Sequence, residues 1–258
     1  MLRALEGQKT RISRTMHGFA FDNVHDEIVV TSPLAQAVLT FKGDAQGEVP
    51  PARVIQGPHT QLAGPPDLGN DRVSIDPVNN EIYVPSLPSS ILVFDRMANG
   101  DVAPKRVLHG PNTGFDQPGI RGMASVAIDP VHNVLVVNHG GSLLIFDRTA
   151  SGNAKPLRTI TGPKSGVTNI SSFQIYSPKG WIVSAIQGGS IGVWSVNDDG
   201  DVPPRWKIPV NQLTGYTASG IALDPVHKEM LLSCAGQRTR PRDGIANAVL
   251  TFSWPEIF

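Results

Sequence analysis

The chain has 258 residues, in which 22 Lys and Arg balance 22 Asp and Glu, so no net charge attracts nucleic acid or an anionic membrane. Its single cysteine, Cys234, excludes an intrachain disulfide and a cysteine-rich metal site, and no apolar run is long enough for a transmembrane helix. Charged residues are sparse at 17%, whereas 26 Gly and 22 Pro favour many short strands joined by tight turns.

In chain order, one phrase returns five times. Its copies are FAFDNVHDEIVV from Phe19, VSIDPVNNEIYV from Val73, VAIDPVHNVLVV from Val126, FQIYSPKGWIVS from Phe173 and IALDPVHKEMLL from Ile221. A period of about 50 residues indicates a repeat architecture, in which each unit buries its apolar face only against its neighbours. We therefore expect a single domain over residues 1–258, with units at about 19–56, 73–109, 126–161, 173–209 and 221–252 plus 2–6.

Each unit contains four strand signals separated by Asp-Pro, Asn, Gly or Pro. In the second unit they cover residues 73–76, 81–84, 91–95 and 105–109, which are rich in Val, Ile, Leu and aromatic residues. No window of 11 or more residues keeps a 3.6-residue period, so helices should be nearly absent.

The Asp-Pro corners predict tight turns after each first strand. Proline fixes φ, and an aspartate side chain bonds to the backbone of its own turn. His25, His132 and His227 all lie in these corners. We therefore interpret them as turn residues exposed to solvent and not as ligands of a metal.

The two ends of the chain predict a closed ring. Residues 2–6 align with the fourth strand of a unit, and the final phrase VLTFSWPEIF supplies a third strand at 249–252. The fold class is therefore predicted as all-β: a five-bladed β-propeller with four antiparallel strands per blade, closed by the N-terminal strand, which completes the last blade.

The phrases GIALDPVHKEMLL and VAIDPVHNVLVV resemble the repeats of bacterial NHL-like and YVTN-like β-propeller proteins. The resemblance spans residues 2–252 and implies the propeller fold. Such repeats occur in enzymes and in binding modules alike, so the resemblance does not imply one activity. The fourth unit departs from the pattern, because Tyr176-Ser177-Pro178-Lys179-Gly180 replaces the Asp-Pro-Val phrase. Five blades is also fewer than such proteins usually have.

Candidate binding residues gather on the loops that lead into first strands and join second to third strands, which meet around the mouth of a propeller channel. The predicted ligand-binding set is His17, Asp71, Arg72, Arg121, Asn138, His139, Asn169, Arg238, Arg240 and Arg242.

Metal-assisted chemistry at this mouth is the alternative. His17, His139 and a carboxylate could ligate zinc, although no HxH or HxxxH spacing supports the pair. Gluconolactonase-like and virginiamycin B lyase-like propellers use the channel mouth for such chemistry, and the former hold a divalent ion with a Glu, two Asn and an Asp. Asn138 and Asn169 lie at comparable positions, but no Glu does. We predict no catalytic residue, no metal and no cofactor, and interpret Cys234 as a buried apolar filler.

The segment GQRTRPRDG, residues 236–244, is a local insertion that concentrates three arginines. Guanidinium groups bind carboxylates and phosphates through paired hydrogen bonds, so an anionic ligand is favoured there. The start of the chain lacks the apolar core of a signal peptide. We expect a cytoplasmic protein, or an extracytoplasmic one whose signal has been removed.

The sequence therefore leaves two alternative functions. The first is a non-enzymatic binding scaffold for a small molecule, a glycan or a protein, without a nucleic-acid or membrane partner. The second is a metal-assisted hydrolase or lyase, lactonase-like, that uses the same channel mouth.

Overall fold

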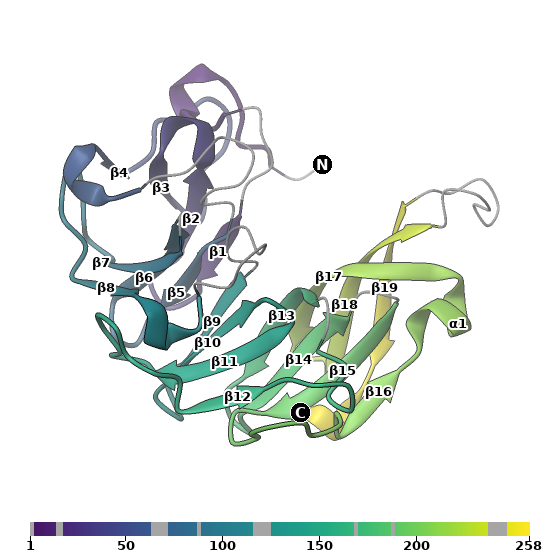
Figure 1. The fold of residues 1–258 in the computed structure, drawn as a ribbon. Coiled ribbons are helices and arrows are strands. Elements are labelled where there is room, and N and C mark those ends of the chain that lie inside the picture. The colour runs from purple at the N-terminus through teal and green to yellow at the C-terminus, as the bar shows by residue number, and fades with distance from the viewer. Residues whose placement is uncertain are drawn as a thin grey trace. The chain divides into compact units, whose positions relative to one another are not determined.

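The computed structural model describes residues 3–13, 18–62, 72–86, 89–115, 125–167, 170–186, 189–236 and 247–258 (Figure 1). Within these ranges the regular secondary structure is almost entirely β-strand, with a few 3-10 helices of three residues each. The α-helical part is limited to the five residues of α1 (Val210–Thr214), as the sequence predicts. None of the helices in these ranges has the length and apolar character needed to cross a membrane.

The strands form five antiparallel sheets, in each of which strands adjacent in sequence pair with each other (Figure 1). The first sheet contains β1 (Phe19–Asp22), β2 (Glu27–Ser32), β3 (Ala37–Lys42) and β4 (Arg53–Gln56). The second contains β5 (Ser74–Asp76), β6 (Glu81–Ser86), β7 (Ser90–Asp95) and β8 (Arg106–His109). The third contains β9 (Ser125–Asp129), β10 (Val134–His139), β11 (Ser142–Asp147) and β12 (Arg158–Ile160).

The fourth sheet contains β13 (Ile170–Tyr176), β14 (Trp181–Ile186), β15 (Ser190–Ser195) and β16 (Trp206–Ile208). The last contains β17 (Tyr216–Asp224), β18 (Glu229–Gly236) and β19 (Asn247–Ser253). Five such sheets make the fold a five-bladed β-propeller, as predicted. The last sheet has three strands in the described part of the chain, not four. Its completion by the N-terminal segment stays a prediction.

The chain divides into two compact units, residues 1–130 with 149–155 and residues 131–148 with 156–258. The single-domain interpretation stays a prediction. In the first unit, Val29 and Val38 of the first sheet pack with Ile82 and Phe94 of the second. In the second unit, the last two sheets share a core that includes Val183, Val193, Met230 and Leu232. These four sheets thus bury apolar residues against a neighbour, which is the packing expected of a repeat.

The corner turns are held by the aspartate that ends the first strand. Asp76 is fully buried, and its Oδ1 accepts hydrogen bonds from the backbone N–H groups of Val78 and Asn79 at 3.1 and 3.0 Å. Asn80 then takes a positive φ of 54°, which Asn tolerates better than most residues. The fourth sheet makes the turn without an aspartate, because Gly180 occupies the left-handed position with φ 63°.

Neighbouring sheets are joined by a repeated contact that we call the clasp. The fourth strand of one sheet bonds to the glycine of the third-to-fourth turn of the next. In the first unit, Gly100 N–H donates to Val54 O at 2.6 Å, and Gln56 N–H donates to Gly100 O at 3.1 Å. Gly152 with residues 107 and 109, and Gly200 with residues 159 and 161, make the same two bonds. The clasp gives each turn glycine a partner outside its own sheet.

A side-chain hydrogen bond adds to two of these clasps. The residue after the turn glycine caps a short 3-10 helix that follows the preceding fourth strand: Asp101 Oδ1 accepts from His59 N–H at 2.8 Å, and Asn153 Oδ1 accepts from Asn112 N–H at 2.7 Å. These helices begin after Gly57 and Gly110, both at positive φ. A Cβ at Gly57 would lie 2.4 Å from Asp101 Cγ, so the close approach requires glycine.

The N-terminal segment makes the same clasp as a fourth strand. Gly47 N–H donates to Ala4 O at 2.6 Å, and Glu6 N–H donates to Gly47 O at 3.2 Å. Glu48 Oε1 then caps the N–H of Lys9 at 3.2 Å. Residues 3–6 thus make the outward contact of a fourth strand, while the pairing predicted for residues 2–6 with a third strand stays a prediction.

Candidate functional site

Most of the predicted channel-mouth residues lie outside the described ranges. These are His17, Asp71, Arg121, Asn169, Arg238, Arg240 and Arg242. The structure places the remaining three, Arg72, Asn138 and His139. Arg72 is half-buried and lies two residues before β5.

Asn138 and His139 end β10 and are almost fully buried, with 3% and 1% of their surface exposed. The Asn138 side-chain amide donates to the carbonyl of Ile170, the first residue of β13, at 3.0 Å. Asn138 therefore ties the third sheet to the fourth within the second unit. Sequence reasoning identified both residues as polar and near a strand end, but it could not show their burial.

In the first two sheets, the residues equivalent to His139 make hydrogen bonds to the segment that precedes the first strand. The equivalents at the ends of β2 and β6 are Ser32 and Ser86, which pair with the first residues of β3 and β7 as His139 pairs with Ser142. The Ser86 hydroxyl donates to Gln61 O at 3.2 Å, and the Ser32 hydroxyl donates to Ser13 Oγ at 3.3 Å. The second-strand end thus anchors the loop that leads into the sheet.

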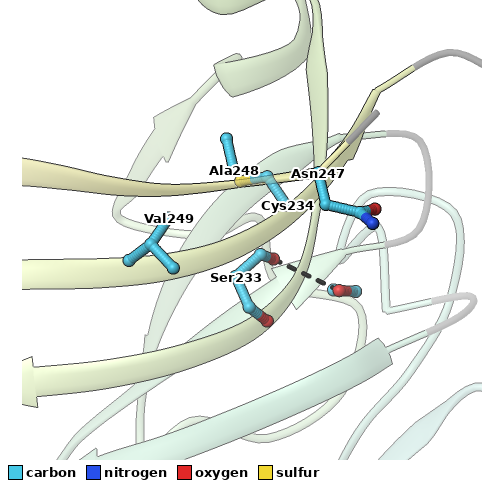
Figure 2. A pocket seen from close by; sticks show the side chains of 6 residues that line it. Ser233, Cys234, Asn247, Ala248 and Val249 are labelled. Atoms are coloured by element: carbon cyan, nitrogen blue, oxygen red, sulfur yellow. Dashed lines mark hydrogen bonds between the residues drawn. The ribbon is translucent and has the colours of Figure 1, made fainter. Parts of the chain in front are cut away.

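An open hollow lies at the end of the last sheet in the second unit. It has a volume of about 420 Å³ and is lined by Ser219, Ser233, Cys234, Asn247, Ala248 and Val249 (Figure 2). Ser219, Ser233 and Asn247 are exposed, and Val249 is 72% exposed. The hollow therefore offers two hydroxyls, an amide and an apolar wall.

A β-bulge shapes this hollow. The register of β17 against β18 shifts between Ala218 and Gly220, so Ser219 is the extra residue, and a bulge re-aims the side chain it contains. The Ser219 hydroxyl donates to Ser233 O at 3.2 Å (Figure 2). Sequence reasoning missed both serines: a one-residue bulge at Ser219 leaves no clear trace in the repeat pattern, and Ser233 is an ordinary strand residue.

Cys234 contributes a buried part of the wall of the hollow. It is 5% exposed, and burial raises the pKa of its thiol because the thiolate is poorly solvated there. The interpretation of this residue as a buried filler is confirmed.

Two of the corner histidines pair with their turn aspartates, a contact that the sequence analysis did not predict. His25 Nδ1 lies 2.7 Å from Asp22 Oδ2, and His227 Nδ1 lies 2.7 Å from Asp224 Oδ2. Burial alone would raise the pKa of Asp22, but hydrogen bonds from His25 and Val24 outweigh it and lower that pKa. The exposed pair shifts in both members: the pKa of Asp224 falls through its bond to His227, and the pKa of His227 rises.

The first unit contains two ionic clusters, each built around a glutamate that begins a second strand. Glu27 Oε2 accepts from Arg53 at 2.6 Å and from Arg96 at 2.7 Å. Glu81 accepts a paired hydrogen bond from Arg106, with both distances at 2.7 Å. Across the ranges that the structure describes, three or more His, Cys, Asp or Glu side chains nowhere come close enough to hold a metal ion.

Comparison with known proteins supports the fold alone. No protein-family model matches this chain, and no curated protein matches its sequence. Among solved structures, 1248 chains are similar, so the fold by itself does not select a function. One is a chain of the "Crystal Structure of Mitotic Checkpoint Complex", with a TM-score of 0.56 and 13% sequence identity over 84% of the present chain. The alignment spans 59% of that chain.

Proposed function

We propose that this protein is a non-enzymatic binding scaffold whose ligand lies at the loop-rich end of its sheets, with the hollow of the last sheet as one part of the site. The hollow is the observation that carries the proposal. Ser219, Ser233 and Asn247 offer neutral hydrogen-bonding groups beside the apolar Val249. A few polar groups on an apolar wall are the usual composition of a ligand site.

We infer the chemical class of the ligand from the residues that are next to the hollow in the sequence. Residues 237–246 connect β18 to β19 and contain Arg238, Arg240 and Arg242. We infer an anionic ligand, such as a peptide carboxylate or an acidic glycan, with the three arginines as its charged contacts and the hollow as its neutral ones. His17, Asp71, Arg72, Arg121, Asn138, His139 and Asn169 remain proposed members of the wider channel mouth.

A scaffold role is in keeping with the solved structure that this fold resembles, since the similar chain there belongs to a complex. From the repeated Asp-Pro-Val phrases we further infer an NHL-like or YVTN-like propeller of bacterial type.

The experiment is a binding screen with carboxylate-terminated peptides and the same peptides as amides, followed by fluorescence anisotropy. A variant with Arg238, Arg240 and Arg242 changed to Ser should lose binding to the carboxylate forms, and Ser233→Leu should weaken it by filling the hollow. The charge-matched control changes Lys155, Lys164 and Lys207 to Ser; these lysines are exposed and do not line the hollow. Unchanged binding by the arginine and Ser233 variants would refute the proposal. Metal analysis tests the alternative, because stoichiometric zinc or calcium with lactone turnover would favour the hydrolase.

A further inference from the structure

The turn between β7 and β8 contains a dipeptide with its own chemistry. Asn99-Gly100 is the single Asn-Gly pair of the chain, and Asn99 is exposed. In such a pair the backbone nitrogen of the glycine can attack the Asn side-chain carbon Cγ, because glycine has no side chain to hinder the approach. A bond forms between that nitrogen and Cγ, the bond from Cγ to the amide nitrogen breaks, and the proton of the glycine nitrogen leaves with the amide nitrogen as ammonia. Water then opens the succinimide to aspartate or isoaspartate.

In the folded protein, hydrogen bonds to the backbone of Val54 engage both reacting groups, one of them the clasp bond of Gly100. The Gly100 N–H donates to Val54 O at 2.6 Å, and Asn99 Oδ1 accepts from Val54 N–H at 2.9 Å. The attacking nitrogen of Gly100 thus points toward β4. The side-chain amide of Asn99 is held through its oxygen by the backbone N–H of Val54. Attack on Cγ requires both bonds to open.

We propose that Asn99 is a site of spontaneous deamidation that the clasp of β4 on this turn keeps closed. Isoaspartate then forms at residue 99 only when the contact between the first two sheets opens locally. The modification would record how often this contact opens, and the co-reactant is water.

The two products should differ in their effect on the clasp. The equivalent turn of the fourth sheet has an aspartate, Asp199, whose Oδ1 accepts from Thr159 N–H at 2.8 Å, while Gly200 N–H donates to Thr159 O at 2.8 Å. Aspartate therefore fits this position. Isoaspartate routes the main chain through Cγ and adds a methylene to it, so the two bonds to Val54 cannot both form.

The test follows deamidation of the full chain by peptide mass spectrometry at neutral pH, in buffer and in concentrated urea. The rate at Asn99 should be about tenfold or more lower in buffer, because only the opened fraction reacts. Gly57→Ala should raise the rate in buffer several-fold, since its Cβ would meet Asp101 Cγ and push the clasp open. Gly110→Ala is the matched control, because it crowds Asn153 Oδ1, at 2.8 Å, in the following clasp and leaves the sequence around Asn99 unchanged.

Equal rates in buffer and urea, an intact Asn99 in urea, or equal acceleration by both glycine variants would overturn the proposal. The products give a second readout that does not depend on how the glycine variants fold. The Asn99→Asp variant should melt at the temperature of the unmodified protein. Protein enriched in isoaspartate at residue 99 should melt lower, and identical melting of the two would contradict the role assigned to the clasp.

Discussion

Trp194 lies so close to Gly192 that a Cβ placed on Gly192 would be 2.4 Å from Trp194 Cη2. Both residues belong to β15, and both depart from a pattern that the other third strands keep. Opposite the second residue of each second strand, the other four sheets have a phenylalanine, Phe41, Phe94, Phe146 and Phe252, where the fourth sheet has Trp194. Two residues earlier the other sheets have Leu39, Leu92, Leu144 and Leu250. The larger indole of the fourth sheet occupies the room that leucine fills elsewhere.

The pair should therefore couple in a double-mutant cycle. Gly192→Leu should lower the free energy of unfolding by about 1–3 kcal/mol, as overpacking of a core does. Adding Trp194→Phe restores the pattern of the other sheets and should recover most of this loss, with a coupling energy of about 0.5–3 kcal/mol. Urea unfolding of the four proteins measures it. Losses that simply add would show that the indole does not use the space over Gly192.

The Glu81–Arg106 pair should make stability depend on acid pH. Burial by itself would raise the pKa of Glu81, but hydrogen bonds from Arg106, Tyr83 and Lys105 outweigh it and lower that pKa from 4.5 to about 2. A carboxylate with a depressed pKa in the folded state stabilises the protein above its unfolded pKa, and this contribution is lost as the pH falls. The loss should run from about pH 4.5 to about pH 2.

Glu81→Gln tests this dependence. At pH 7 it should cost about 1–3 kcal/mol, because it leaves the part-buried Arg106 without a charged partner. The difference from the unmodified protein should shrink on acidification across the same pH window. Asp44→Asn, at an exposed position, is the control and should change little at either pH. A pH-independent cost for Glu81→Gln would contradict the assigned role of its charge.

The corner turns permit a comparison of one set of bonds in two environments. Asp76 is fully buried, whereas the side chain of Asp224 is 33% exposed. Each accepts from two backbone N–H groups of its turn. Asp76→Ala should cost about 1–3 kcal/mol, because the N–H groups left behind are less accessible to water. Asp224→Ala should cost less, and equal losses in thermal or urea unfolding would refute the difference.

The sequence indicated these corner turns because their hydrogen bonds span only two or three residues. Asp-Pro and the residue in the left-handed position are visible in a short window. The clasps could not be found in that way, since Gly57 and Asp101 or Gly110 and Asn153 meet across more than forty positions. The repeated Gly-x-x-Thr and Gly-Asp phrases were visible signals, but nothing local shows that one binds the other. The burial of Asn138 and His139 likewise depends on neighbouring sheets and not on their own loop.

Ring closure can be argued from the alternation of the clasp bonds. In β4, Val54 O and Gln56 N–H face Gly100, while Arg53 and Ile55 pair with Thr40 and Val38 of β3. In the N-terminal segment, Ala4 O and Glu6 N–H face Gly47 in the same way. The opposite edge of this segment carries the backbone groups of Arg3 and Leu5. In β4, the corresponding edge is the one that pairs with the third strand β3. A third strand without a fourth among the described residues is β19.

The repeat predicts the register of that pairing. Leu39 lies opposite Val54, and the equivalents of these residues are Leu250 and Ala4. Because the backbone of Val54 bonds elsewhere, the pair has the close Cα approach of a non-hydrogen-bonded pair, which suits a disulfide. In a Cys234→Ala background, cysteines at Ala4 and Leu250 should oxidise within one chain and raise stability by about 2–4 kcal/mol. Cysteines at Ala4 and Thr251 form the off-register control and should stay reduced.

Deleting residues 1–7 should lower the melting temperature. Disulfide-linked dimers in place of monomers, or a truncated protein that melts like the full chain, would show that the N-terminal segment does not complete the last sheet of its own chain.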